Sequence, residues 1–239
     1  MNILIPMAGA GSRFSKAGYK NPKPLIDVAG KPMIERVIEN IGLTDANYIF
    51  IAQRQHLRDH PEIKKQLISS AESVQIVEID GLTEGAACTT LLAKSLINNE
   101  SPLLICNADQ WVDWDVKHFV NFVKNSDGAI PYFLSDSPKH SYSRINFHTG
   151  FIDQVAEKQV ISNFATVGIY YWKTGSSYVE CAERMIAKNI RFNNEFYICP
   201  VYNELIHHFN GNVLPYPVFE MRGMGTPEEL DKFLNKLEE

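Results

Sequence analysis

An apolar strand that runs directly into a glycine-rich loop constrains this chain more than any other feature. The strand, Asn2–Pro6, continues into Met7-Ala-Gly-Ala-Gly-Ser-Arg-Phe14. Small residues after a strand let backbone N–H groups approach a phosphate without interference from a Cβ atom. Arg13 places a cation inside this loop, and Lys23 follows between two prolines. These features predict a site for a nucleoside triphosphate.

Apolar strands alternate with helical patterns through the first half of the chain. The expected strands are Asn2–Pro6, Tyr48–Ala52, Val74–Ile79 and Leu103–Asn107, and the expected helices are Pro32–Ile41, Glu62–Ser70 and Gly85–Asn98. Strands that are apolar throughout and alternate with helices predict a mostly parallel sheet with both faces covered.

After the turn signal Asp127-Gly128, strands follow one another without helices between them. We expect strands at Ala129–Leu134, Ser143–Phe147, Phe151–Ala156 and Thr166–Trp172, then helices at Ser176–Ala187, Tyr202–Phe209 and Pro227–Leu237. The pattern predicts a single domain over residues 1–239 with an α/β fold. Its sheet is Rossmann-like, mixed and mostly parallel, flanked by helices, with a small β-rich lobe.

The composition excludes several classes of protein. A net charge of −5 argues against a general nucleic-acid or anionic-membrane surface, so we expect phosphate binding to depend on a few placed cations. The four cysteines show no metal-binding spacing, which favours reduced core residues and a cytoplasmic location. We find no apolar run that approaches the length of a membrane span.

Two common phosphate loops fit the glycine-rich segment poorly. No Walker A string, GxxxxGK[ST], occurs in the chain. A dinucleotide fingerprint requires a third small residue where Phe14 stands. The residues after the loop include Gly18, Pro22 and Pro24, which prevent a regular crossover helix.

The segment instead resembles the sugar-phosphate nucleotidyltransferase family, also called nucleoside-diphosphate-sugar pyrophosphorylases. That family opens with a strand, a glycine-rich loop ending in Thr/Ser-Arg, then Pro-Lys-Pro-Leu and Gly-Lys-Pro-Met/Ile. The matching residues here are Gly9, Gly11, Ser12, Arg13, Pro22, Lys23, Pro24, Leu25, Gly30, Lys31, Pro32, Met33 and Ile34. Ala10 replaces a glycine that is common in the family. The resemblance implies a nucleotide-diphospho-sugar transferase type of fold, with a nucleotide-binding part at 1–127. Residues 128–239 then form the acceptor-binding part and the C-terminal helices.

The resemblance also implies a reaction, in which a phosphomonoester oxygen attacks the α-phosphorus of an NTP and expels pyrophosphate. The nucleotide-binding residues would be Ala8, Gly9, Gly11, Ser12, Asp80 and Gly85. Arg13 would stabilise the leaving pyrophosphate, and Lys23 the α-phosphate and the attacking phosphate. Lys31 stays outside the catalytic set because a solvated lysine at a helix start explains it equally well.

A divalent cation, expected to be Mg²⁺, should bridge the phosphates. The apolar strand Leu103–Asn107 leads to Asp109, which matches the family's metal-binding aspartate; an N-cap carboxylate is the alternative. The family supplies a second acid two residues before the late Gly-Thr, where this chain has Gly223. Glu220 is one candidate replacement, and water with the phosphates is another.

The motifs that would recognise the base and the acceptor are less specific than the opening motifs. Asp80, five residues before Gly85, matches the family's base-reading residue, and its carboxylate favours cytosine or guanine; an exposed aspartate in a turn explains the residue equally well. Glu157 and Lys158 match the family's Glu-Lys pair, in which Glu holds sugar hydroxyls and Lys meets the acceptor phosphate. Glu195 belongs to a cluster with Tyr197, Tyr202 and Asn203 that would line the acceptor pocket.

The leading hypothesis is transfer of a nucleotidyl group from an NTP to a sugar 1-phosphate. Its alternatives are a cytidylyltransferase for a non-sugar phosphate, a glycosyltransferase that uses Asp113 and Asp115, and a regulatory protein that binds nucleotide-sugars. The expected partners are an NTP and a small phosphorylated acceptor, with no nucleic acid and no membrane. The sequence leaves the oligomeric state open, a homo-oligomer included.

Overall fold

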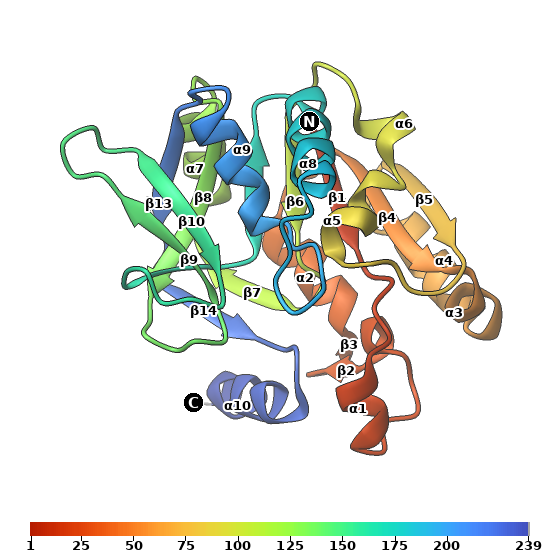
Figure 1. The fold of residues 1–239 in the computed structure, drawn as a ribbon. Helices are drawn as coiled ribbons and strands as arrows, with labels where there is room; N and C mark the ends of the chain where they lie inside the picture. Colours follow the sequence, from red (N-terminus) through yellow and green to blue (C-terminus); the bar gives the residue numbers. More distant parts are fainter. Residues whose placement is uncertain (239) are drawn as a thin grey trace.

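A ten-stranded sheet with helices on both faces forms the centre of the molecule (Figure 1). The computed structural model describes residues 1–238. The strands lie in the order β10-β9-β11-β8-β12-β6-β1-β4-β5, and β13 pairs with β8 beside this path. The prediction of a mixed α/β sheet flanked by helices is confirmed.

The first half of the chain supplies the parallel part of the sheet. Its strands are β1 (Asn2–Pro6), β4 (Asn47–Gln53), β5 (Ser73–Ile79) and β6 (Leu103–Cys106). The connecting helices are α2 (Met33–Ile41), α3 (Arg54–Asp59), α4 (Pro61–Ser69), α5 (Ala86–Leu91) and α6 (Lys94–Ile97). β1 pairs in parallel with both β4 and β6, so it lies at the middle of this half.

The second half extends the same sheet with antiparallel strands. They are β8 (Gly128–Leu134), β9 (Ser141–Ile145), β10 (Ile152–Glu157), β11 (Phe164–Thr166) and β12 (Ile169–Trp172), while β13 (Val213–Pro217) runs parallel to β8. The helices here are α7 (Val116–Val123), α8 (Gly175–Ala187), η2 (Cys199–Val201), α9 (Tyr202–His207) and α10 (Pro227–Glu238). The division of the chain at residue 127 coincides with the change from parallel to antiparallel strands, and its functional meaning stays a prediction.

Small additional elements surround the edge of the sheet. They are α1 (Ser12–Lys16), η1 (Lys23–Leu25), the pair β2 (Asp27–Val28) and β3 (Lys31–Pro32), and the pair β7 (Gln110–Asp113) and β14 (Glu220–Gly223). The β7–β14 pair links the segment after β6 to the segment before α10.

Two apolar clusters hold the helices against the sheet. Ile3 and Ile5 of β1 belong to the cluster on the face covered by α2, α3, α4, α7 and α10, whereas Leu4 belongs to the cluster under α5, α6, α8 and α9. Alternate residues of one strand therefore enter opposite cores, because strand side chains alternate between faces. This explains why β1 is apolar throughout.

Two predicted elements are interrupted in the structure. The predicted strand Thr166–Trp172 is wrong as one piece, because Gly168 turns the chain at φ +74° between β11 and β12. The predicted helix Gly85–Asn98 is likewise divided at Leu92 and Ala93 into α5 and α6. The helix α7 was not predicted, and its N-cap is Asp115, whose side chain accepts a hydrogen bond from the His118 N–H at 2.9 Å.

The carboxyl ends of β1, β4, β5 and β6 meet at one edge of the sheet. Open α/β sheets bind ligands at this edge, at the point where neighbouring connections diverge. β1 leads there to the glycine-rich loop, β5 to Asp80, and β6 to Asp109. Within residues 1–238, none of the helices has the length and apolar character needed to cross a membrane.

Candidate active site

The glycine-rich loop curves around the end of β1. Gly11 adopts φ +61°, which glycine tolerates far better than other residues, and it stands directly before α1. A Cβ atom on Gly11 would lie 3.6 Å from Lys23 Cβ, so the loop packs against the lysine segment. Gln53 Nε2 donates a 2.7 Å hydrogen bond to the Ala8 carbonyl and ties the loop to β4. Around Gly9 there is open space, whereas Ser12 and Arg13 begin α1 and are partly or fully exposed.

Lys23 joins this loop to the end of β6. It begins η1 between Pro22 and Pro24, and its Nζ atom forms an ion pair with Asp109 Oδ2. The two side chains are about one quarter exposed. The structure therefore brings together a predicted catalytic lysine and the predicted metal ligand, which are 86 residues apart in the sequence.

A second carboxylate lies beside Asp109, although it does not come from position 223. A Cβ atom on Gly225 would lie 2.9 Å from Asp109 Oδ2 and 3.3 Å from Glu229 Oε2. A Cβ atom on Gly223 would lie 3.0 Å from the same Glu229 oxygen. Both carboxylates therefore lie against Gly225, and Glu229 also lies against Gly223, where a side chain on either glycine would crowd them. Lys139 Nζ holds the other oxygen of Glu229 at 3.1 Å.

The other acids considered from the sequence have structural partners. Glu220 is bound by Arg222 and Lys236, and it pairs with Asp113 at the far end of β14 from Gly223. Asp115 caps α7. Among the described residues, no group of three or more His, Cys, Asp or Glu side chains is placed to hold a metal ion, which applies to Asp113 and Asp115 and equally to Asp109 and Glu229.

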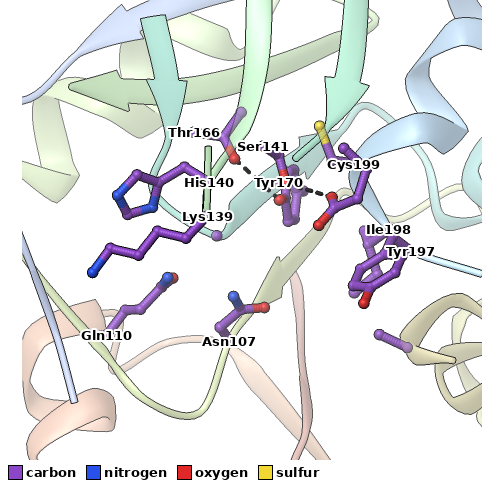
Figure 2. A pocket seen from close by; sticks show the side chains of 13 residues that line it. Asn107, Gln110, Lys139, His140, Ser141, Thr166, Tyr170, Tyr197, Ile198 and Cys199 are labelled. Carbon is purple, nitrogen blue, oxygen red and sulfur yellow. Dashed lines mark hydrogen bonds between the residues drawn. The ribbon is translucent and has the colours of Figure 1, made fainter. Parts of the chain in front are cut away.

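A polar pocket of about 160 Å³ opens beside the ends of β6 and β10 (Figure 2). Figure 2 shows Asn107, Gln110 and Lys139 on one side and Tyr197 on the other. Glu157 also lines this pocket, and its acceptor-binding role stays a prediction. The lining therefore includes Gln110, the neighbour of the predicted metal ligand Asp109, whereas the predicted acceptor residues Lys158 and Glu195 are not part of it.

Glu157 is a buried acid at the base of the pocket. Its side chain accepts a hydrogen bond from Ser141 Oγ at 2.5 Å. Burial raises the pKa of the Glu157 carboxyl, while Ser141 and Lys158 act in the opposite direction. Gln110 Oε1, another buried oxygen of the lining, has no hydrogen-bond partner among the described residues. Both oxygens can accept hydrogen bonds from a ligand.

His140 lies beside these acceptors. Burial lowers the pKa of His140, and the neighbouring Lys139 lowers it further. The charge of Glu229 acts in the opposite direction but is the smallest of the three influences, so the neutral form is favoured, and a neutral imidazole can donate one hydrogen bond and accept another.

The predicted base-reading loop lies at the end of β5. Asp80 is 74% exposed, and its Oδ2 atom pairs with Arg54 Nη1 at 2.5 Å. Gly85 has a structural reason to be glycine, because its φ is +131° and a Cβ atom would lie 2.5 Å from the backbone N and O of Phe196. The backbone of Phe196 bonds to Glu84 O at 2.8 Å and to Ala87 N at 2.9 Å.

The segment that carries Phe196 also contacts the predicted acceptor lysine. Lys158 Nζ donates a 2.8 Å hydrogen bond to Tyr197 Oη, which in turn donates to Glu195 Oε2 at 2.5 Å. Glu195 is exposed and is connected to the pocket through Tyr197. Tyr202, also part of the predicted aromatic cluster, is instead fully buried in the core.

Comparison with known proteins identifies the family. The model of the family described as nucleotidyl transferase matches residues 3–196, which is most of the chain. The chain belongs to the nucleotidyl transferase family. The resemblance inferred from the opening motifs is thereby confirmed.

Relatives within and around this family are similar to the chain over part of their length. Mannose-1-phosphate guanylyltransferase 1 of Arabidopsis thaliana is 26% identical over 181 residues, covering 71% of this chain and 49% of the relative. The bifunctional protein GlmU of Methanocaldococcus jannaschii is 28% identical over 128 residues, covering 51% of this chain and 28% of the relative. The chain therefore matches half or less of these proteins.

Solved structures match the whole fold. A nucleoside-diphosphate-sugar pyrophosphorylase from Vibrio cholerae has a TM-score of 0.83 at 26% identity, covering 98% of this chain and 99% of that one. A UDP-glucose pyrophosphorylase complexed with UDP-glucose has a TM-score of 0.77 at 17% identity, covering 99% and 98%, and supports the fold alone.

Several residues of this nucleotidyl transferase site were not predicted from the sequence. Asn107, Gln110, Lys139 and His140 line the pocket, and Glu229 approaches Asp109. Gln110 follows Asp109 directly, so the position of Asp109 at a strand end was a usable signal for it. Lys139 and His140 lie between β8 and β9 in a segment without a motif, and only the tertiary fold brings them to the pocket.

Proposed function

We propose that this protein transfers a nucleotidyl group from an NTP to a sugar 1-phosphate, with Mg²⁺, and releases pyrophosphate. The observation that carries the proposal is the ion pair between Lys23 and Asp109. It places a fixed cation and a carboxylate where the glycine-rich loop and the end of β6 meet. Both substrates are polyanions, so catalysis depends on held charges and orientation more than on acid–base groups.

The reaction balances without any further reactant. An acceptor phosphate oxygen forms a bond to the α-phosphorus, and the bond from that phosphorus to the oxygen bridging to the β-phosphate breaks. The electron pair leaves with pyrophosphate. In this proposal Lys23 contacts the α-phosphate, and Arg13 on α1 contacts the β- and γ-phosphates. The backbone of Ala8, Gly9, Gly11 and Ser12 follows the triphosphate.

The residues beside Lys23 fit a Mg²⁺ ion. Asp109 and Glu229 offer the hard oxygen ligands that Mg²⁺ prefers, and the absence of a side chain at Gly225 lets the two carboxylates approach the same point. We propose Glu229 as the substitute for the acid that the family has at position 223. The ion would supply charge neutralisation on the phosphates.

The pocket supports a sugar as the acceptor. Glu157 and Gln110 present oxygen acceptors, which a ligand with several O–H donors can satisfy. A choline-like phosphate offers a trimethylammonium group without such donors, and it would leave Gln110 Oε1 unpaired at a cost of about 1–3 kcal/mol. Mannose 1-phosphate and glucose 1-phosphate, which have the chemistry named for similar proteins, are therefore the first acceptors to test.

The nucleotide is open to experiment. Arg54 and Asp80 together offer a donor and an acceptor at the end of β5, where a base edge would lie. We propose a cytoplasmic location as well, which the four free cysteines support.

A matrix of four NTPs against a set of sugar 1-phosphates and phosphocholine tests the function. We expect pyrophosphate release only when NTP, acceptor and Mg²⁺ are all present. Silence across the matrix would refute the proposal. Release of free sugar from a nucleotide-sugar without NTP turnover would favour a glycosyltransferase instead. Tight binding of nucleotide-sugars without turnover would favour a regulatory protein.

A further inference from the structure

We propose that Tyr197, which lines the pocket, is a positioning residue that holds the Lys158 ammonium beside the pocket to bind the phosphate of the acceptor. This inference rests on the proposed function, because it assumes that a phosphorylated acceptor enters the pocket. Tyr197 lines that pocket (Figure 2), and Glu157 belongs to the same lining. The tyrosine would act through the lysine and not on the reacting atoms.

Two kinds of contact hold Lys158 on Tyr197. Lys158 Nζ donates to Tyr197 Oη at 2.8 Å and also lies 4.5 Å from the centre of the tyrosine ring. The ring of Phe192 lies 5.7 Å from the same ammonium on another side. An ammonium has three N–H donors, so one bond to a phenol leaves donors for phosphate oxygens. Fixing a free lysine side chain costs about 1.5–2 kcal/mol of conformational entropy. Because these contacts already order Lys158, less of that entropy is lost when the acceptor binds.

The backbone turns Lys158 away from the acid that precedes it. Glu157 is the last residue of β10 and faces the pocket, whereas Lys158 adopts φ +51° in the left-handed region. A residue other than glycine in this region costs about 1–2 kcal/mol. As a result, Glu157 is bonded to Ser141 and Lys158 is bonded to Tyr197. The two neighbouring side chains do not form an ion pair with each other.

Tyr197 is itself fixed to the edge of the sheet. Phe196, the preceding residue, is bound through its backbone to Glu84 and Ala87 at the start of α5. Arg191 stacks 4.0 Å from the centre of the Phe196 ring and pairs with Glu84 at 2.6 Å. The segment that carries Tyr197 is therefore bound to the loop that follows β5.

The surroundings keep the phenol protonated. Burial raises the pKa of Tyr197, as do the hydrogen bond and charge of Glu195, while the charge of Arg13 lowers it. The neutral phenol therefore donates to Glu195 and accepts from Lys158, which fixes the orientation of its oxygen.

Four variants test the role of Tyr197. Tyr197→Phe keeps the ring and removes the oxygen, Tyr197→Leu removes both, and Lys158→Ala removes the cation. The double variant Lys158→Ala/Tyr197→Phe asks whether the tyrosine acts through the lysine. Tyr132→Phe on β8 is the matched control, because it removes a phenol oxygen away from these contacts.

We expect Tyr197→Phe to raise the KM for the sugar 1-phosphate about 10-fold, which corresponds to about 1.4 kcal/mol. The KM for NTP should stay within about 2-fold, and Tyr197→Leu should have a larger effect on the acceptor. In the Lys158→Ala background, Tyr197→Phe should change nothing further. An equal effect in both backgrounds, or no effect in either, would overturn the proposal.

Calorimetric titration of glucose 1-phosphate and mannose 1-phosphate without NTP separates this inference from the proposed function. Wild-type protein that binds a sugar phosphate but never releases pyrophosphate would refute the function, and the loss of affinity in Tyr197→Phe would still support the inference. Wild-type protein that binds neither sugar phosphate and shows no turnover would overturn both. Turnover with an unchanged acceptor affinity in Tyr197→Phe would overturn the inference alone.

Discussion

The two sides of the candidate site hold their lysines in different ways. Lys23, on the nucleotide side, is paired with the carboxylate of Asp109, whereas Lys158, on the acceptor side, is bound to the neutral phenol of Tyr197. A carboxylate cancels the charge of its lysine, and a phenol orients a lysine without cancelling it. The nucleotide side therefore keeps its charge compensated until a metal ion and phosphates arrive, while on the acceptor side the lysine has a neutral partner and keeps N–H donors for an incoming anion.

The largest expected effect lies on the nucleotide side. Lys23→Ala should lower kcat by about 10³-fold, equivalent to about 4 kcal/mol, because a held charge at the α-phosphate acts in the transition state. Pyrophosphate release measures the change. Lys31→Ala is the matched control, because Lys31 lies in a similar Gly-Lys-Pro segment and pairs with Glu39 on α2. Equal losses in the two variants would end the distinction between these lysines.

The next-largest expected effect concerns Glu229, the proposed second ligand of Mg²⁺. Glu229→Gln should raise the Mg²⁺ concentration needed for half-maximal activity about 10-fold, because one of two oxygen ligands loses its charge. Binding of Mn²⁺ in the presence of NTP, followed by electron paramagnetic resonance, gives a readout independent of turnover. Glu228→Gln, its neighbour on α10, should leave metal binding unchanged.

A compensating change sharpens this assignment. In Glu229→Ala the space beside Gly223 opens, so adding Gly223→Asp should restore Mn²⁺ binding. Failure of this rescue, together with normal binding by Glu229→Gln, would remove Glu229 from the metal site. Melting temperatures show whether α10 stays folded in each variant.

An effect of similar size, on stability instead of activity, tests the contact between the two sides. Gly85→Ala should destabilise the fold by about 1–3 kcal/mol, because the new Cβ atom meets the backbone of Phe196 and the φ of +131° disfavours a side chain. Gly9→Ala should leave stability nearly unchanged, because the same group would enter open space. Urea unfolding compares the two. Similar losses in both would show that the packing around Gly85 is looser than the structure indicates.

The smallest effect is the pH dependence of Glu157. Its raised pKa means that the folded protein holds this proton to a higher pH than the unfolded chain, so stability from this group is greatest in acid and falls as pH rises above 4.5. Glu157→Gln should therefore be more stable than wild type at pH 7–8 by about 1 kcal/mol or less, with the difference vanishing below pH 4. Thermal melts across this range measure it. A constant difference at every pH would assign the effect to packing.

The sequence predicts the nucleotide side far better than the acceptor side. The glycine-rich loop, Lys23 and Asp109 lie in contiguous motifs at strand ends, and parallel strands bring such ends together. The acceptor pocket collects side chains from β7, the β8–β9 connection, β10 and the segment before η2. The register of the antiparallel strands and the pairing of distant segments decide which of these residues meet. The local pattern of apolar and polar residues predicts neither.

Two particular residues show the limit. Glu229 approaches Asp109 because β14 pairs with β7 and α10 follows directly, an arrangement that the Gly-Thr-Pro-Glu-Glu string does not reveal. Gly85 resembled a residue needed for close approach of a nucleotide, and the structure adds a second reason, its contact with Phe196. A glycine signal alone does not tell which backbone approaches it.

The close backbone contact between Gly85 and Phe196 has a consequence for engineering substrate preference. The loop after β5 and the segment 191–197 share backbone hydrogen bonds and an ion pair. The conformation of each segment therefore depends on the other. A chimera that imports the first loop alone from a homologue places foreign residues against a native counterpart. Exchanges of residues 80–87 should therefore be made together with residues 191–197, as one transplanted unit.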